Sequence, residues 1–215
     1  MKILMINPNT SVEISQTVDR IAKRYASPET EITTVNPDEG PDHLSNPYDY
    51  ALQAPKVIEL IEKNLNDYDF FVNACAADPG LDACRLITRN VIGIGEAAYL
   101  TACAVARKFS VIYELKQGEP IIRERIHRYG IDQSRCASVK VIGKGDGEIV
   151  KKRNEMLDAY YQAGRECVEK DKAGALILAC AGMADLKERL EGALKVPAFS
   201  GVESAVKIAE QISVI

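Results

Sequence analysis

A short apolar segment that ends at a cysteine occurs twice in this chain, and this repeat constrains the fold more than any other feature. The sequence Ala-Leu-Ile-Leu-Ala at 175–179 precedes Cys180, and Phe-Phe-Val-Asn-Ala at 70–74 precedes Cys75. Each run has the length and apolar character of a parallel strand that is buried on both faces. The cysteines at 75 and 180 are 105 positions apart. We therefore expect two related strands, each with a thiol at its carboxyl end.

The sequence that follows each cysteine repeats as well. A short helical pattern comes first, and then Gly-Ile-Gly-Glu-Ala-Ala at 93–98 or Ser-Gly-Val-Glu-Ser-Ala at 200–205, whose glutamates are 107 positions apart. The same offset places the segment 2–7 on 109–114. Three pairings in the same order predict a duplicated α/β unit. Two such units would pack about a pseudo-twofold axis, which would bring the two cysteines face to face across a cleft.

Apolar segments of strand length alternate with helical patterns along the whole chain. The alternation predicts an α/β fold with parallel sheets and a functional site at the carboxyl ends of the strands. The expected division is one lobe of residues 1–95 with 202–215 and a second lobe of residues 96–201. Strands are expected at 2–6, 31–35, 70–74, 109–113, 137–142, 175–179 and 196–199, and helices at 47–64, 96–108, 120–129, 148–171, 185–194 and from 202 onward.

Polar residues before the helical patterns predict how the helices begin. Thr10 and Glu13 have the spacing of a capping box. Asp78, followed by a proline, is typical of an N-cap, so Cys75 is expected just before a helix N-terminus. The polar segment 36–46 is either a solvated connection or a lid over an active site.

Charge and hydropathy restrict the partners of the protein. A net charge of −4 without a basic cluster argues against nucleic acid. No segment approaches the roughly 20 apolar residues of a membrane span, and Asn7-Pro8-Asn9 interrupts the apolar start of the chain too early for a signal peptide. We therefore expect a cytoplasmic protein that binds a small-molecule substrate and neither nucleic acid nor a membrane.

The six cysteines are expected to be thiols rather than a disulfide framework. No pair has CxxC spacing and the chain has only two histidines, so the sequence predicts no zinc site. Four of the thiols lie on apolar helix faces or lack polar neighbours and are expected to pack in the core or lie at the surface. They are Cys84, Cys103, Cys136 and Cys167.

Cys75 and Cys180 are the candidate catalytic residues because each follows a buried strand and precedes a helix start. Backbone N–H groups at such a position lower the pKa of a thiol below its free value of about 8.5. Inversion of a stereocentre needs two weak acid/base groups on opposite sides of one carbon, one to remove a proton and one to deliver a proton. A pair of thiols meets this need without a metal, a nicotinamide or a Schiff-base lysine, so we expect no cofactor.

Six motifs carry a resemblance to a known family. They are Ile6-Asn7-Pro8-Asn9-Thr10, Tyr48-Asp49-Tyr50-Ala51-Leu52, Cys75-Ala76-Ala77-Asp78-Pro79-Gly80-Leu81, Gly93-Ile94-Gly95-Glu96-Ala97-Ala98, Cys180-Ala181-Gly182-Met183-Ala184-Asp185-Leu186 and Gly201-Val202-Glu203-Ser204-Ala205-Val206-Lys207. Together, over nearly the whole chain, they resemble the aspartate/glutamate/hydantoin racemase superfamily, and within it the hydantoin and allantoin racemase branch.

The resemblance implies two pseudo-symmetric Rossmann-like lobes with the active site in the cleft between them, exchange of the C-terminal helix between the lobes, and a homo-oligomer. It also implies cofactor-independent inversion at C5 of a hydantoin-type substrate, with Cys75 and Cys180 as the acid/base pair. The residues expected to bind substrate are Asn7, Asn9, Tyr48, Ala76, Ala77, Tyr113, Glu114, Ala181 and Gly182.

One position departs from the family pattern. Hydantoin racemases usually carry a Thr-Thr pair where this chain has Tyr113-Glu114, at the second-lobe equivalent of Asn7-Pro8-Asn9. A carboxylate there would accept N–H groups of a ureido or hydantoin ring, or pair with an ammonium, and it would repel a substrate carboxylate. In the alternative interpretation Glu114 points to solvent and Tyr113 packs in the core.

Other functions fit parts of the sequence. The segment 93–98 matches the dinucleotide-binding pattern GxGxxA, with Glu114 about 20 residues further on, although Glu96 would place a negative charge beside the pyrophosphate. A dinucleotide-binding oxidoreductase, a non-catalytic small-molecule binder and a thiol–disulfide switch of Cys75 and Cys180 are therefore alternatives. Within the superfamily, the alternative is an Asp/Glu-type amino-acid racemase. Relatives that decarboxylate malonates keep one catalytic cysteine, and the presence of both Cys75 and Cys180 argues against that activity here.

Overall fold

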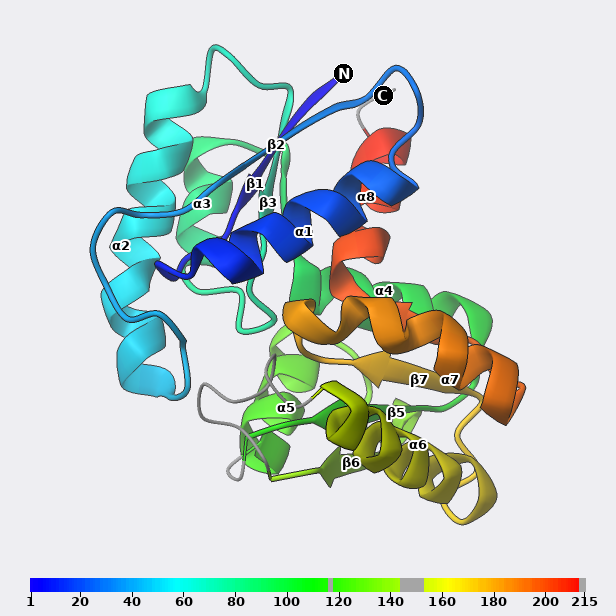
Figure 1. The fold of residues 1–215 in the computed structure, drawn as a ribbon. Helices are drawn as coiled ribbons and strands as arrows, with labels where there is room; N and C mark the ends of the chain where they lie inside the picture. Colours follow the sequence, from blue (N-terminus) through cyan, green and yellow to red (C-terminus); the bar gives the residue numbers. More distant parts are fainter. Residues whose placement is uncertain (116–117, 144–152, 213–215) are drawn as a thin grey trace. The chain divides into compact units, whose positions relative to one another are not determined.

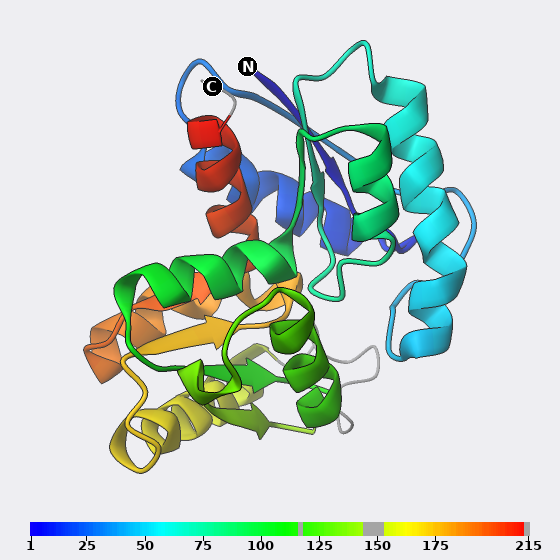
Figure 2. The same cartoon turned by 180° about the vertical axis from the view of Figure 1, so that it is seen from behind.

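The computed structural model describes residues 1–115, 118–143 and 153–212 (Figure 1). The chain forms two compact units. Unit 1 consists of Met1–Ala97 and Gly201–Ile215, and unit 2 consists of Ala98–Ser200. Each unit is built on a parallel sheet with helices packed against it, as the view from behind also shows (Figure 2).

The sheet of unit 1 has four parallel strands in the order β2-β1-β3-β4. The strands are β1 (Lys2–Ile6), β2 (Glu31–Val35), β3 (Phe70–Asn73) and β4 (Val91–Gly93). Helices α1 (Val12–Tyr25) and α8 (Gly201–Ile212) pack together on one face, and α2 (Pro47–Asn64) and α3 (Leu81–Ile87) pack together on the other (Figure 1). The central strands β1 and β3 are buried almost throughout, as their mostly apolar sequences predict.

The sheet of unit 2 has four parallel strands in the order β6-β5-β7-β8. The strands are β5 (Phe109–Tyr113), β6 (Cys136–Val141), β7 (Ala175–Leu178) and β8 (Ala198–Ser200); the helices are α4 (Ile94–Val105), α5 (Gly118–Arg128), α6 (Arg153–Glu169) and α7 (Lys187–Leu194), with 3₁₀ turns η1 (Gln133–Arg135) and η2 (Ala181–Leu186). One apolar cluster joins the sheet to α4 and α5, and another joins it to α6 and α7.

The two sheets have the same strand order, with every strand of the second numbered four higher than its counterpart. This confirms the predicted α/β fold of two related units with parallel sheets. Helix α4 follows the last strand of unit 1 but lies mostly in unit 2, and α8 follows the last strand of unit 2 but lies in unit 1. The helix that follows β4 in the sequence therefore packs mainly with the strands of unit 2, and the helix that follows β8 packs with the strands of unit 1.

The predicted offset of 107 is wrong by one residue for the first strand of each unit. The N–H of Ala74 donates to the C=O of Ile6 at 2.7 Å, and the N–H of Ala179 donates to the C=O of Ile112 at 3.1 Å. Positions 74 and 179 correspond at the cysteine offset of 105, so Ile6 corresponds to Ile112, 106 positions away. Tyr113, rather than Glu114, is then the counterpart of the residue that follows β1.

Helix α1 begins one residue later than the capping-box spacing predicts. Ser11 is its N-cap, and the Oγ of Ser11 accepts the N–H of Ile14 at 3.3 Å. Thr10 serves another purpose, because its N–H donates to the C=O of Pro41 at 3.1 Å. The segment 36–46 is thereby tied to the turn that follows β1.

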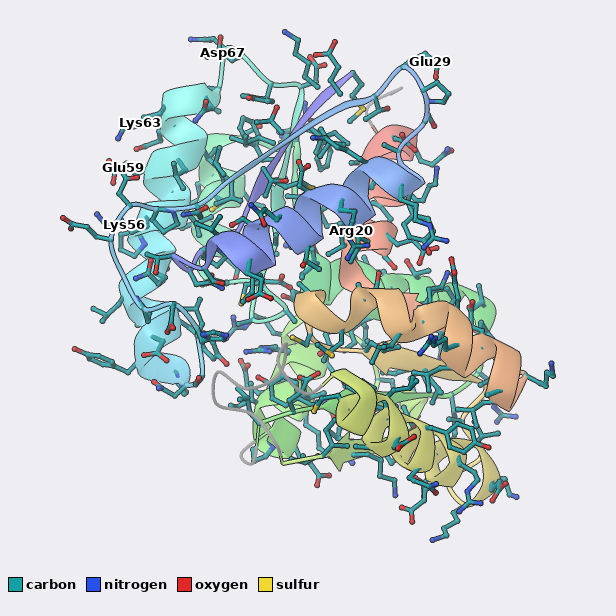
Figure 3. The ribbon with its side chains drawn as sticks, viewed as in Figure 1. Arg20, Glu29, Lys56, Glu59, Lys63 and Asp67 are labelled. Carbon is teal, nitrogen blue, oxygen red and sulfur yellow. The ribbon has the colours of Figure 1, made fainter. Side chains whose placement is uncertain are left out.

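The outer face of α2 carries a row of charged side chains, which Figure 3 shows at Lys56, Glu59 and Lys63. The Nζ of Lys63 lies 2.6 Å from Glu59 Oε1, and this ion pair lowers the pKa of the exposed Glu59 carboxyl. The opposite face is buried on the sheet through Gln53, Val57 and Ile61. The charged and buried faces together fix the orientation of α2 about its axis.

The starts of further helices differ from the prediction: the helix expected at 96–108 is α4, which begins at Ile94. The helix expected at 148–171 is observed as α6, and residues 148–152 lie outside the described residues. The helix expected from 120 begins at Gly118, and the one expected at 185–194 is η2 followed by α7. Among the helices that the structure describes, none has an apolar stretch long enough to cross a membrane.

Candidate active site

Cys75 lies in a tight turn at the carboxyl end of β3. Its C=O accepts the N–H of Asp78 at 2.8 Å. The side chain of Asn73, the last residue of the strand, contacts the turn at both ends: Oδ1 accepts the N–H of Cys75 at 3.4 Å, and Nδ2 donates to the C=O of Pro79 at 2.8 Å. Asn73 is buried and Cys75 is half-buried. The turn is thus fixed to the strand by a buried amide.

The sequence predicts that Asp78 caps the helix that follows it, and this prediction is wrong. Gly80, with a φ of 74°, is the N-cap of α3. The carboxylate of Asp78 instead caps α4: Oδ1 accepts the N–H of Gly95 at 3.0 Å, and Oδ2 accepts the N–H of Glu96 at 2.8 Å. A Cβ on Gly93 would lie 2.1 Å from Asp78 Oδ1, so the glycine makes room for the carboxylate. The two glycines of the Gly-x-Gly sequence therefore make room for the Asp78 carboxylate of the protein itself.

This arrangement counts against the dinucleotide-binding alternative. In that class of site the pyrophosphate occupies the helix N-terminus and accepts its free N–H groups. Here the carboxylate of Asp78, only 2% exposed, takes both of these N–H groups at the start of α4. Glu96 adds a second negative charge and pairs with Arg85. A pyrophosphate at this position would have to displace one carboxylate and lie beside another.

Asn7 and Asn9 follow β1, the neighbour of β3 in the sheet. The Nδ2 of Asn7 donates to Asn9 Oδ1 at 2.9 Å, to Ser15 Oγ at 3.0 Å and to the C=O of Ser11 at 3.3 Å. Reversing the Asn7 amide would place its oxygen against two carbonyl oxygens, so the orientation is determined by these partners. Asn7 Oδ1 is buried and has no hydrogen-bond partner within the described ranges. It is an acceptor without a donor beside the Cys75 strand.

The other predicted residues of unit 1 differ in exposure. Ala77 is 7% exposed, and Ala76 is half-buried with its C=O against Gly95, where a Cβ would lie 2.5 Å from the oxygen. Both belong to the Cys75 turn. Tyr48 lies in the first turn of α2 and is 71% exposed. The structure therefore brings Asn7, Asn9, Cys75, Ala76 and Ala77 to one edge of the unit 1 sheet and leaves Tyr48 on an exposed helix end.

Cys180 follows β7 and opens η2 as its N-cap residue. Its C=O accepts the N–H of Met183 at 3.0 Å, which repeats the hydrogen bond of the Cys75 turn 105 positions later. Cys180 is half-buried and packs against the apolar cluster that contains Met183 and Tyr160. Ala181 is half-buried, and Gly182 lies within η2. These three predicted residues share the carboxyl end of β7.

Tyr113 is the last residue of β5, which pairs with β7, and Glu114 follows the strand. The ring of Tyr113 packs in the cluster beneath α4 and α5, as the alternative interpretation of this residue expects. Glu114 is 2% exposed and does not point to solvent. Its Oε1 accepts the hydroxyl of Tyr160, from α6. Desolvation by burial raises the pKa of the Glu114 carboxyl to about 8.

The four remaining cysteines have the environments of packing residues. Burial raises the pKa of the Cys84 and Cys136 thiols to about 11, and it also raises the pKa values of Cys103 and Cys167. Such thiols are poor acids and poor nucleophiles at neutral pH. Over the ranges that the structure describes, no group of three or more His, Cys, Asp or Glu side chains is arranged to hold a metal ion.

Sequence reasoning missed three residues that shape these turns. Asn73 lies at the end of a segment that is otherwise apolar, and its contacts with the Cys75 turn are not apparent from the sequence. An asparagine at the last position of a buried strand is unusual, and this was the signal that could have identified it. The hydrogen bond between Asp78 and Gly95 joins residues 17 positions apart, and the one between Tyr160 and Glu114 joins residues 46 positions apart. Local spacing carries no signal for contacts of that range.

Comparison with known proteins gives the family. The family model described as Asp/Glu/Hydantoin racemase matches residues 3–209. A hydantoin racemase of Pseudomonas sp. (strain NS671) is 36% identical over 99% of this chain and 86% of its own length, and one of Paenarthrobacter aurescens is 34% identical over 99% and 91%. The solved allantoin racemase from Klebsiella pneumoniae has a TM-score of 0.93 and 33% identity over 100% of this chain and 88% of its own. The chain therefore belongs to the Asp/Glu/hydantoin racemase family of isomerases.

Proposed function

We propose that this protein inverts the C5 stereocentre of 5-substituted hydantoins or of allantoin, with Cys75 and Cys180 as the acid/base pair and without a cofactor. The observation that carries the proposal is the matched turn after β3 and β7, in which each cysteine C=O accepts the N–H of the residue three positions on. Each thiol thus lies at the carboxyl end of an equivalent parallel strand, where α/β sheets place their reacting groups. The names of the relatives support the substrate class.

The chemistry consists of two proton transfers. One thiolate removes the proton from C5, and the electron pair of that C–H bond forms an enolate with the adjacent ring carbonyl. The opposite thiol then gives its proton to the other face of C5, and the electron pair of the enolate forms the new C–H bond. The two sulfurs have exchanged protonation states when the product leaves, so no net proton is gained or lost. Both enantiomers are therefore substrates.

The Asn7 amide supports a substrate with an N–H group near the stereocentre. Asn7 Oδ1 is a buried acceptor whose orientation is fixed by three contacts on Nδ2. A ring or ureido N–H of a hydantoin or allantoin satisfies such an acceptor. A substrate without that donor would leave the buried oxygen unpaired, which costs binding energy.

Solvent exchange tests the proposed reaction. In deuterated water, with 5-substituted hydantoins, allantoin and free amino acids offered separately, we expect inversion of a hydantoin-type substrate with deuterium at C5 of the product. Mass spectrometry and polarimetry on the same samples measure both events against an enzyme-free background. Inversion of free aspartate or glutamate alone would favour the amino-acid racemase alternative, and inversion without deuterium would contradict proton exchange with a solvent-accessible thiol.

Replacing Asn7 with leucine is expected to lower kcat/KM by about 5- to 150-fold, because a hydrogen bond to a buried acceptor is worth on the order of 1–3 kcal/mol. Asn36→Ala is the matched control. It removes the Oδ1 that accepts Ser15 Oγ at 3.0 Å but leaves Asn7 Oδ1 in place, so we expect lower stability with nearly unchanged kinetics. Wild-type kcat/KM in the folded Asn7→Leu variant would remove Asn7 from the substrate site.

We also propose that the protein acts in the cytoplasm as a homo-oligomer on a small-molecule substrate. Analytical ultracentrifugation over a range of protein concentrations measures the oligomeric state. A single monomeric species at micromolar concentration would contradict this part of the proposal.

A further inference from the structure

We propose that Asp78 is a positioning residue for Cys75, acting by locking the turn between β3 and α3 onto the first turn of α4. The inference rests on the proposed function of Cys75 as an acid/base group. Asp78 is joined to the cysteine by the backbone hydrogen bond between its own N–H and the C=O of Cys75 at 2.8 Å. Its carboxylate is joined to α4 by the N–H groups of Gly95 and Glu96. One residue thus connects the reacting turn to a helix.

The surroundings of the carboxylate are shaped to hold it. A Cβ on Gly93 would lie 2.1 Å from Asp78 Oδ1, and a Cβ on Gly95 would lie 2.7 Å from Oδ2 and 2.5 Å from the C=O of Ala76. Two glycines therefore allow both the carboxylate and the turn backbone to approach α4. Asp78 is 2% exposed, so the two hydrogen bonds from α4 replace the water that a carboxylate would otherwise keep.

The backbone of Asp78 is held in an unfavourable conformation. Its φ is 48°, in the left-handed region, which is strained for a residue with a Cβ. Glycine would adopt this conformation freely. The two hydrogen bonds that the carboxylate accepts from α4 are of the strong, charge-assisted kind and offset this strain. The contacts of the side chain, and not the backbone conformation of the turn, therefore account for an aspartate at this position.

The second unit shows that the turn forms without a carboxylate. Met183 is the equivalent of Asp78 at the offset of 105, and its N–H makes the same bond to the C=O of Cys180 at 3.0 Å. The Met183 side chain is buried in the apolar cluster against which Cys180 packs. The two thiols are therefore held by different means, Cys180 by apolar packing and Cys75 by a polar lock. A change at position 78 should affect Cys75 and leave Cys180 as it was.

Asp78→Asn tests the lock with little change of shape. The asparagine oxygen accepts one of the two α4 N–H groups, and its NH₂ group faces the other, so half of the lock is lost. We expect kcat for inversion to fall by as much as about 10²-fold with KM nearly unchanged, because small displacements of a catalytic group have effects of that size. We also expect iodoacetamide to alkylate Cys75 several-fold faster and Cys180 at its original rate, measured by peptide mass spectrometry.

The control is Asp132→Asn, the same substitution at the N-cap of η1, where Asp132 Oδ1 accepts the N–H of Ser134 at 2.8 Å. It should change neither alkylation rate nor kcat. If Asp78→Asn does not fold, Gly95→Ala disturbs the same contact from the other side and should give the same selective effect on Cys75. A lower melting temperature with both alkylation rates and kcat unchanged would show that Asp78 is purely structural.

The alkylation measurement separates this inference from the proposed function. If inversion persists when either cysteine is replaced, the two-thiol mechanism fails, yet the selective change at Cys75 still reports on the lock. If inversion depends on both cysteines and the Asp78 and Gly95 variants leave Cys75 reactivity unaltered, the mechanism stands and the lock is overturned.

Discussion

Replacing either Cys75 or Cys180 with serine is expected to reduce inversion by about 10³-fold or more, within the range that one acid/base group contributes to proton transfer. A serine hydroxyl is a far weaker acid than a thiol, so it neither holds a negative charge as a base at neutral pH nor delivers a proton as readily. Polarimetry with each enantiomer of a 5-substituted hydantoin measures the loss.

The two variants should differ from each other in a way that general damage would not produce. Each keeps one thiol, which still removes and returns the C5 proton on its own face. We therefore expect Cys75→Ser to exchange the C5 hydrogen of one enantiomer for deuterium without inversion, and Cys180→Ser to do so with the opposite enantiomer. Exchange of the same enantiomer by both variants would contradict a pair of bases on opposite faces.

Cys103→Ser is the matched control, because this half-buried thiol lies in α4 and outside both cysteine turns. Its inversion rate should equal that of the wild type. Full inversion in both Cys75→Ser and Cys180→Ser would remove the two-thiol mechanism, and the family relationship would remain.

The positions of the strands and of both cysteines could be predicted because the information is local or repeated. A parallel strand that is buried on both faces is typically a nearly continuous apolar run. The strands β1, β3 and β7 each contain one, and β5 is interrupted only by Ser110. The repeat then predicted the duplicated fold. The pairing register was less accessible: β5 and β6 shift register between Phe109 and Ser110, an irregularity that no spacing of residue types reveals.

The details of the candidate site depend on contacts between distant parts of the chain. Thr10 and Ser11 are adjacent hydroxyl residues, and only the backbone geometry decides which one caps α1. Asp78 has every local mark of a cap for α3, yet it caps α4 because Gly93 and Gly95 admit its carboxylate there. The sequence therefore predicted that Asp78 caps a helix but not which helix it caps.

Glu114 illustrates the same limit and leads to the second large effect. The sequence placed its carboxyl either in a pocket or in solvent, and the structure places it in the interior with the hydroxyl of Tyr160 as partner. A carboxyl in this environment is a poor anion, because no cation within the described residues lies beside it to replace the lost water. Below about pH 8 it is mainly a neutral acid, which does not repel a substrate carboxylate as a charged one would.

Stability should therefore fall as the pH rises from about 5 to 9, and Glu114→Gln should abolish much of this decline. Burial raises the pKa of the Glu114 carboxyl from 4.5 to about 8, so between these values the folded protein holds a proton that the unfolded chain has released. The contribution of protonated Glu114 to the free energy of unfolding is fully present below the pKa of this carboxyl in the unfolded chain. It is lost as the pH rises through the pKa in the folded protein. Each pKa unit corresponds to about 1.4 kcal/mol, so urea unfolding at several pH values resolves the effect.

Glutamine is neutral at every pH, so the Glu114→Gln variant should match the wild type near pH 5 and exceed its stability at pH 9. Glu59→Gln provides a control of opposite sign. Its exposed carboxyl has a pKa lowered by Lys63, so its contribution is present above the unfolded pKa and is lost only in acid. An equal decline between pH 5 and 9 in the wild type and in Glu114→Gln would mean that Glu114 is already ionised in the folded protein. Its interaction with Tyr160 would then be a charged one, and a substrate carboxylate would be repelled from this end of β5 at neutral pH.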